Sequence, residues 1–148
     1  MRGQDVRTLI DANVVLRYLL EEDAESADAA ERIIRNGAVL LAEVACEVVF
    51  VLSGFYKMSR AEICSYLTGF IDEVVCPDGD VLKTALFIYK KRSKLDFVDA
   101  ILAARHQVDL DRVETFDRKL ANALKLIDET GSAIPTNTVK GGRSAKGG

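Results

Sequence analysis

Residues 6–20 read VRTLIDANVVLRYLL, and this stretch sets the expected fold class. The run VRTLI is short, apolar and β-branched and ends at Asp11, which predicts a strand buried on both faces, as in a parallel sheet. From Val14 to Leu20 the apolar residues recur at helical spacing, so we expect a helix to begin at Asp11 or Asn13. A strand followed directly by a helix is the repeating unit of an α/β domain.

The rest of the chain continues this alternation of strands and helices. Further strands are predicted at 38–42, 73–76 and 112–115, with a possible edge strand at 125–127 or 132–134. Further helices are predicted at 24–36, 43–57, 59–71, 78–92, 95–107 and 117–124. This order predicts a three-layer α/β/α sandwich with a central, mostly parallel sheet of four to five strands.

The length and charge of the chain limit what it can be. The 148 residues suffice for one domain with a sizeable core, which we place at 1–138, followed by a flexible, glycine-rich basic tail at 139–148. The formal net charge of −3 argues against strong nonspecific binding to nucleic acid, although a local basic rim remains compatible with it.

The cysteines and the apolar runs point to a cytoplasmic protein that does not enter the membrane. Cys46, Cys64 and Cys76 stand far apart without a CxxC pair, which argues against a disulfide framework and against structural zinc. No apolar run approaches the roughly 20 residues needed to cross a bilayer, and the first residues contain no apolar signal core.

Four acidic residues stand beside buried strands or at helix starts: Asp11, Glu47, Asp99 and Asp117. No basic residue adjoins the first three, and an unpaired buried charge costs several kcal/mol in order-of-magnitude terms. Ligands of open α/β sheets bind beyond the carboxyl ends of the strands, where all four acids can lie. Carboxylates gathered there need a cation, and oxygen ligands favour Mg²⁺ or Mn²⁺, which points to phosphodiester chemistry.

Each acid also has a purely structural interpretation. Asp11 can cap the following helix, which is worth about 1 kcal/mol. Asp99 can favour the dipole of its helix, and Asp117 can cap the last helix or pair with Arg118 or Lys119. Glu47 has the weakest such alternative, because it stands in the middle of a very apolar helix.

Two neighbouring acids leave the assignment of the site open. Glu43 lies four residues before Glu47 on the same helix face, where it suits the helix start better than the site. Asp96 lies three residues before Asp99 and is the expected N-cap of that helix, with a possible supporting role in the site.

The segments LIDANVVLRYLL, LAEVACEVVFVL, DFVDAILAA and ETFDRKLA, in this order, resemble the PIN domain family, and within it the VapC-like toxin ribonucleases. The resemblance implies an α/β/α fold and RNA cleavage that depends on Mg²⁺ or Mn²⁺. It places Asp11, Glu47, Asp99 and Asp117 on the acidic quartet of the family, with Asn13 and Thr115 as supporting residues. It also implies a homodimer and a small antitoxin protein as a partner.

The RNA contacts expected for such an enzyme would come from basic residues near the acids: Arg17, Lys94, Arg118 and Lys119. His106 has no serine or cysteine motif beside it, so a catalytic triad is not expected. Two other functions are weighed against the ribonuclease. One is a noncatalytic α/β module that binds RNA or a protein through the same groove. The other is a phosphatase-type enzyme with Asp11 as the nucleophile, which Asn13 at the second position disfavours.

Overall fold

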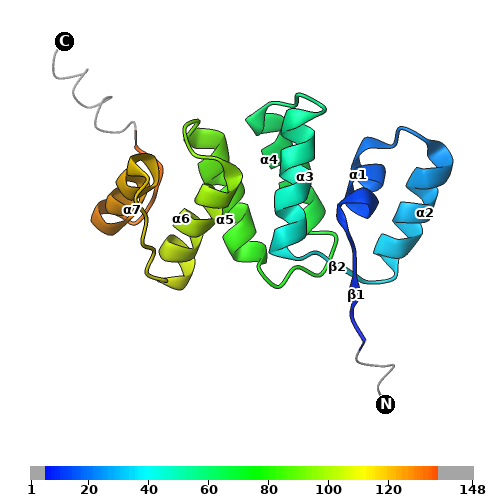
Figure 1. Cartoon of the computed structure of the whole chain (residues 1–148). Coiled ribbons are helices and arrows are strands. Elements are labelled where there is room, and N and C mark those ends of the chain that lie inside the picture. The colour runs from blue at the N-terminus through cyan, green and yellow to red at the C-terminus, as the bar shows by residue number, and fades with distance from the viewer. Residues whose placement is uncertain (1–5, 137–148) are drawn as a thin grey trace, which may run out of the picture.

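The structure, a computed structural model, describes residues 6–136 and consists mainly of helices set side by side in an elongated row (Figure 1). The predicted tail at 139–148 lies outside the described residues. The strands are β1 (Thr8–Leu9) and β2 (Ala38–Val39), and the helices are α1 (Ala12–Leu20), α2 (Ala24–Arg35), α3 (Ala42–Gly54), α4 (Arg60–Ile71), α5 (Gly79–Lys91), α6 (Phe97–Asp109) and α7 (Arg118–Thr130). No helix in this range is long and apolar enough to cross a membrane.

The sheet begins as the sequence predicts. β1 and β2 are parallel, with Thr8 opposite Ala38 and Leu9 opposite Val39. The amide of Ile10 continues this pairing by donating to the carbonyl of Val39 at 3.2 Å. The predicted third strand, at 73–76, is reduced to one isolated parallel bridge between Val75 and Val39, on the side of β2 away from β1.

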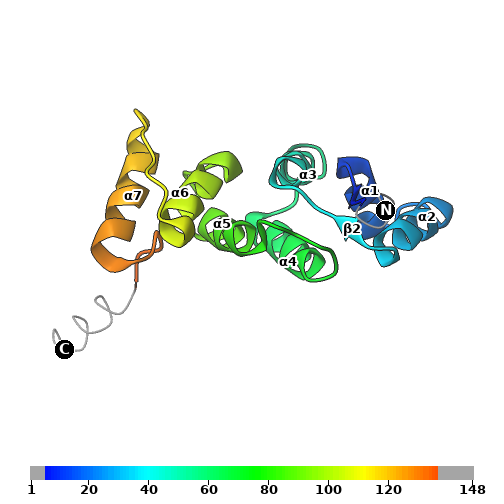
Figure 2. The same cartoon turned by 90° about the horizontal axis from the view of Figure 1, so that it is seen from below.

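The prediction of a four- to five-stranded sheet is wrong for the described residues, which contain a two-stranded sheet and this one bridge. Residues 112–115 are extended but pair with no strand, because they lie near α7 at the opposite end of the row from β1 (Figures 1 and 2). The possible edge strand at 125–127 is part of α7, whose buried residues Leu120, Leu124 and Ile127 follow helical spacing. Residues 132–134 also form no strand.

The helix boundaries follow local sequence signals closely. Asp11 caps α1 by accepting a hydrogen bond from the amide of Val14 at 3.1 Å. Ser59 and Glu62 form a capping box at the start of α4, each side chain accepting a hydrogen bond from the other residue's amide. Gly37 ends the turn after α2 with φ of +93°, a conformation that favours glycine.

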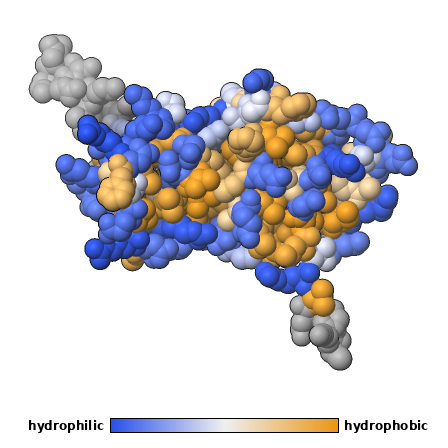
Figure 3. Space-filling view, in the orientation of Figure 1, coloured by the Kyte–Doolittle hydropathy of each residue, from blue (hydrophilic) through white to orange (hydrophobic). Residues whose placement is uncertain are grey.

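The core runs through the middle of the row. Its largest fully buried side chains come from α3, α4, α5 and α7, from the residue after β2 and from the loop before α6: Leu40, Leu52, Ile63, Leu67, Phe70, Leu82, Leu86, Ile88, Leu95 and Leu120. The apolar helix α3 supplies Val48 and Leu52 to this core but leaves Phe50 78% exposed. Figure 3 shows the result as apolar surface gathered over the centre of one face.

Arg60 connects α4 to the junction between α5 and α6. Its Nη1 lies 2.8 Å from the carbonyl oxygen of Tyr89, 3.3 Å from that of Arg92 and 2.6 Å from that of Leu95. The guanidinium also stacks 4.0 Å from the centre of the Tyr89 ring. Further along, Arg92 donates to the carbonyl of Ala133 at 3.1 Å, just beyond α7. These contacts join α4, α5, α6 and the end of α7 into one block.

Candidate acidic site

Three carboxylates gather where α6 and α7 begin. Asp96 is the N-cap of α6 and accepts a hydrogen bond from the amide of Asp99 at 2.8 Å, as predicted. Asp99 lies in the first turn of α6, and Asp117 is the N-cap of α7, where it accepts from the amide of Lys119 at 3.1 Å. Both helix starts are favourable places for negative charge.

The surroundings of the Asp99 carboxyl favour its neutral form. Its burial raises the pKa above the ordinary value, and the charges of Asp96 and Asp117 raise it further. A hydrogen bond to Asp96 acts in the same direction, whereas the charge of Lys119 lowers the pKa. The structure therefore places Asp96 and Asp117 within electrostatic range of Asp99.

Thr115 lies next to Asp117 and orders the chain before α7. Its hydroxyl oxygen accepts a hydrogen bond from the Asp117 amide at 3.0 Å. This bond sets the direction in which the chain enters α7 and so positions the Asp117 carboxylate.

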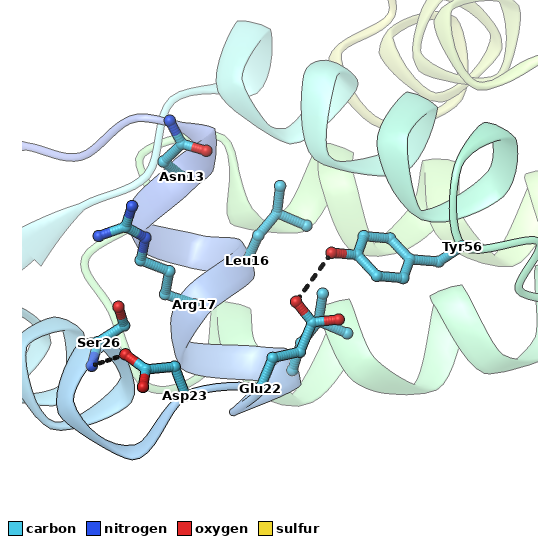
Figure 4. Close-up of a pocket in the computed structure, with 8 residues that line it drawn as sticks. Asn13, Leu16, Arg17, Glu22, Asp23, Ser26 and Tyr56 are labelled. Carbon is cyan, nitrogen blue, oxygen red and sulfur yellow. Dashed lines mark hydrogen bonds between the residues drawn. The ribbon is translucent and has the colours of Figure 1, made fainter.

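Asp11 and Asn13 lie apart from this cluster, at the start of α1. Asp11 is exposed, and it is not among the charges that shift the pKa of Asp99. Asn13 lines a pocket between α1, the turn into α2 and the chain beyond α3 (Figure 4). The guanidinium of Arg17 lies on the same side of α1, and the Tyr56 hydroxyl donates to Glu22 across the pocket at 3.2 Å.

Glu43 and Glu47 lie on α3 and are both exposed. Burial raises the pKa of Cys46, which stands between them, and the charges of Glu43 and Asp96 raise it further. This turn of α3 is therefore close to the start of α6. Within the described range, Glu47 forms no hydrogen bond or ion pair, and its charge is not among those acting on Asp99.

The acids provide the right kind of ligand for a hard divalent ion, because all of them offer oxygen atoms. Their placement is incomplete: among residues 6–136, no three aspartate, glutamate, histidine or cysteine side chains lie where one ion could bind them together. A single chain in this arrangement therefore does not fit a complete metal site.

His106 has a role that the sequence did not reveal. Its Nδ1 lies 2.7 Å from the carbonyl oxygen of Asp111, and its Nε2 lies 2.7 Å from a carboxylate oxygen of Asp128 on α7. Both neighbours are acceptors, so only the protonated ring can donate to both. These two bonds raise the pKa of His106 above its usual 6.5. The partners lie 5 and 22 residues away along the chain, so no local sequence pattern indicates this role.

We expect the contact between α6 and α7 to weaken as the pH rises. A raised pKa in the folded state gives stability that is fully present below the unfolded pKa, about 6.5, and is lost as the pH rises through the folded value. Urea unfolding between pH 5.5 and 8.5 measures this, and His106→Gln should flatten the dependence. If the His106→Gln protein keeps the full pH dependence, another group is responsible.

The helices, the parallel strands and the acidic cluster together define an α/β domain with carboxylates gathered at helix starts. The profile of the PIN domain matches residues 8–126, and the chain belongs to that family. Members of this family have an α/β fold and are typically nucleases that bind divalent metals. Comparisons with curated proteins and with solved structures found no match.

Proposed function

We propose that this protein is a metal-dependent endoribonuclease that cleaves RNA phosphodiester bonds, and that it is the toxin of a toxin–antitoxin pair. Membership of the PIN family supports the nuclease class. The observation that carries the proposal is the gathering of Asp99 and Asp117, whose carboxylates are close enough to raise the pKa of Asp99. The VapC-like order of the four segments supports the choice of RNA and the toxin role.

In this proposal Mg²⁺ or Mn²⁺ binds to Asp11, Glu47, Asp99 and Asp117. Asn13, Thr115 and Asp96 support these ligands, Thr115 through its bond to the Asp117 amide. A divalent ion would supply charge neutralisation for the phosphate group. The proposed protein is cytoplasmic and a homodimer, and an antitoxin protein covers its groove.

Basic side chains near the acids are the proposed contacts to the RNA backbone. Lys119 is close enough to lower the pKa of Asp99, and Arg118 adjoins it at the start of α7. Arg17 lies in the pocket beside Asn13 (Figure 4). Lys94 is exposed shortly before α6. Lysine and arginine at such positions neutralise phosphates without reading the base sequence.

The substitution Asp11→Asn tests the proposal. Asparagine caps a helix about as well as aspartate, so the substitution keeps the capping role of residue 11 and removes only its charge. We expect the stability of the metal-free protein to change by less than about 0.5 kcal/mol. Cleavage of a mixed-sequence RNA in the presence of Mn²⁺ should fall by at least about 100-fold, which corresponds to about 2.7 kcal/mol of transition-state stabilisation.

Asp23 gives a matched control, because it caps α2 in the same way by accepting from the amide of Ser26 at 3.0 Å. Asp23→Asn should leave both stability and cleavage unchanged. The proposal is wrong if the wild-type protein fails to cleave RNA with either metal, or if Asp11→Asn and Asp23→Asn have the same effect on cleavage.

The second candidate is a noncatalytic module that binds RNA or a protein through the same groove. The incomplete metal site within one chain favours it. Such a module shows no metal-dependent increase in melting temperature, whereas a bound ion raises the apparent stability of the enzyme by mass action. Thermal unfolding with and without Mn²⁺ therefore separates the two functions.

A further inference from the structure

An extended segment of the chain, Arg112–Phe116, has no strand to pair with. It connects α6 to α7, and within the described residues none of its amides or carbonyls forms a backbone hydrogen bond. Phe116 is fully exposed and Leu110, just before the segment, is 83% exposed. An unpaired backbone with exposed apolar side chains is a ready partner for a strand edge.

The outer edge of β1 is equally unpaired. The amide of Ile10 faces β2, because it donates to Val39. Successive residues of a strand direct their amide groups to opposite sides, so the N–H and C=O of Leu9 face away from β2. No other strand of the described residues lies there. Leu9 is 51% exposed and Val6 is 68% exposed at this edge.

Within one chain these two edges are far apart. β1 lies beside α1 and α2 towards one end of the row, and the Arg112–Phe116 segment lies at the other end (Figures 1 and 2). The bonds of Arg60 and Arg92 hold the block from α4 to α7 in that position. Closing the sheet within the chain would require this whole block to move relative to α3, with which α4 and α6 are in contact.

We propose that two copies of the chain complete each other, with the Arg112–Phe116 segment of one copy pairing in parallel with β1 of the other. This inference rests on the proposed function and deepens it. A reciprocal exchange between two copies satisfies both free edges at once and needs no rearrangement inside the block.

The exchange also explains why the metal-binding group is incomplete in one chain. Asp11 follows β1, and Asp117 follows the extended segment. In a parallel pair both strands end at the same edge of the sheet, so Asp11 of one copy comes next to Asp117 and Asp99 of the other. Each site of the dimer is then built from both chains.

Mixing two inactive variants tests this arrangement. Asp11→Asn and Asp117→Asn proteins are unfolded in urea, combined in equal amounts and refolded together. In an exchanged heterodimer one site carries both changes and the other carries none. Because half of the dimers are mixed, about a quarter of wild-type Mn²⁺ binding and RNA cleavage should return. If each site lies within one chain, every site keeps one change and nothing returns.

Two controls complete the mixing experiment. Each variant refolded alone must stay inactive, and wild type taken through the same urea cycle must recover. Manganese binding, measured by electron paramagnetic resonance, gives a readout that does not depend on the RNA chosen. A wild-type protein that binds no Mn²⁺ and cleaves no RNA overturns the proposed function. A wild-type protein that does both, with no recovery on mixing, overturns only the exchange.

The mass of the protein in solution tests the exchange independently of the proposed function. Light scattering should show a dimer for the wild type. Leu9→Pro removes the outward N–H of β1 and keeps the Ile10 bond to β2, so we expect at least a roughly 10-fold weaker dimer. Leu9→Ala keeps that N–H and should weaken the dimer less. A monomeric wild type at micromolar concentration, or a dimer indifferent to Leu9→Pro, overturns the inference.

Discussion

Replacing Asp99 with asparagine is expected to abolish most RNA cleavage while making the metal-free protein no less stable. The carboxylate of Asp99 is partly buried beside Asp96 and Asp117, and these causes raise its pKa. A carboxyl whose pKa is raised by folding destabilises the folded state progressively as the pH rises from the unfolded pKa through the folded one. Asparagine carries no charge, so the variant avoids this loss of stability. The transition state for RNA cleavage, however, loses the Asp99 carboxylate as a proposed metal ligand.

Cleavage should fall by at least about 100-fold in the Asp99→Asn protein. Urea unfolding without metal should show that wild type loses stability relative to the variant as the pH rises from about 4 towards neutral. The matched control is Asp109→Asn, at the other end of α6, where a negative charge faces the unfavourable end of the helix dipole. The Asp109→Asn protein should cleave RNA as fast as the wild type. Full activity in Asp99→Asn would exclude this carboxylate from the site.

Replacing Arg60 with methionine is expected to cost about 3 kcal/mol in the free energy of unfolding. The change removes the guanidinium that donates to the carbonyl of Tyr89, near the end of α5, and to that of Leu95. The stacking on the Tyr89 ring is lost with it. Partly buried carbonyls left without a donor keep their desolvation cost, so methionine's similar volume does not compensate.

Two variants define what Arg60 contributes. Arg60→Lys keeps the charge but not the planar group that stacks on Tyr89, so it should recover less than half of the loss. Arg35→Met removes an ion pair to Glu31 in which the arginine side chain is 74% exposed, and should cost much less stability than Arg60→Met. Equal losses for Arg60→Met and Arg35→Met in urea unfolding would show that α4 is not anchored through Arg60.

The helices and their caps could be predicted from the sequence, because the signals involve residues three or four apart. Asp11, Ser59 and Asp96 stand one turn before the amides they cap, and all three were expected as helix starts. The edge strand expected at 125–127 failed for a related reason. A short apolar run fits a strand as well as a helix, and only the packing of α7 decided between them.

The candidate site could be predicted only in part. The resemblance selected Asp99 and Asp117, which the structure brings together with Asp96 through the adjoining starts of α6 and α7. Asp11 and Glu47 were selected by the same reasoning, and the structure does not bring them to this cluster within one chain. The ring nitrogens of His106 and the guanidinium of Arg60 found their partners across the fold, where no local pattern announces them.

The sequence by itself determined the order of the helices and of the first two strands, the capped ends of the helices and the family, because periodicity, capping and motif order are properties of neighbouring residues. The tertiary structure alone decided which carboxylates meet and which strand edges stay open. Those outcomes depend on groups about a hundred positions apart, such as β1 and the Arg112–Phe116 segment. Their approach is governed by the packing of α4 to α7 and not by any local preference.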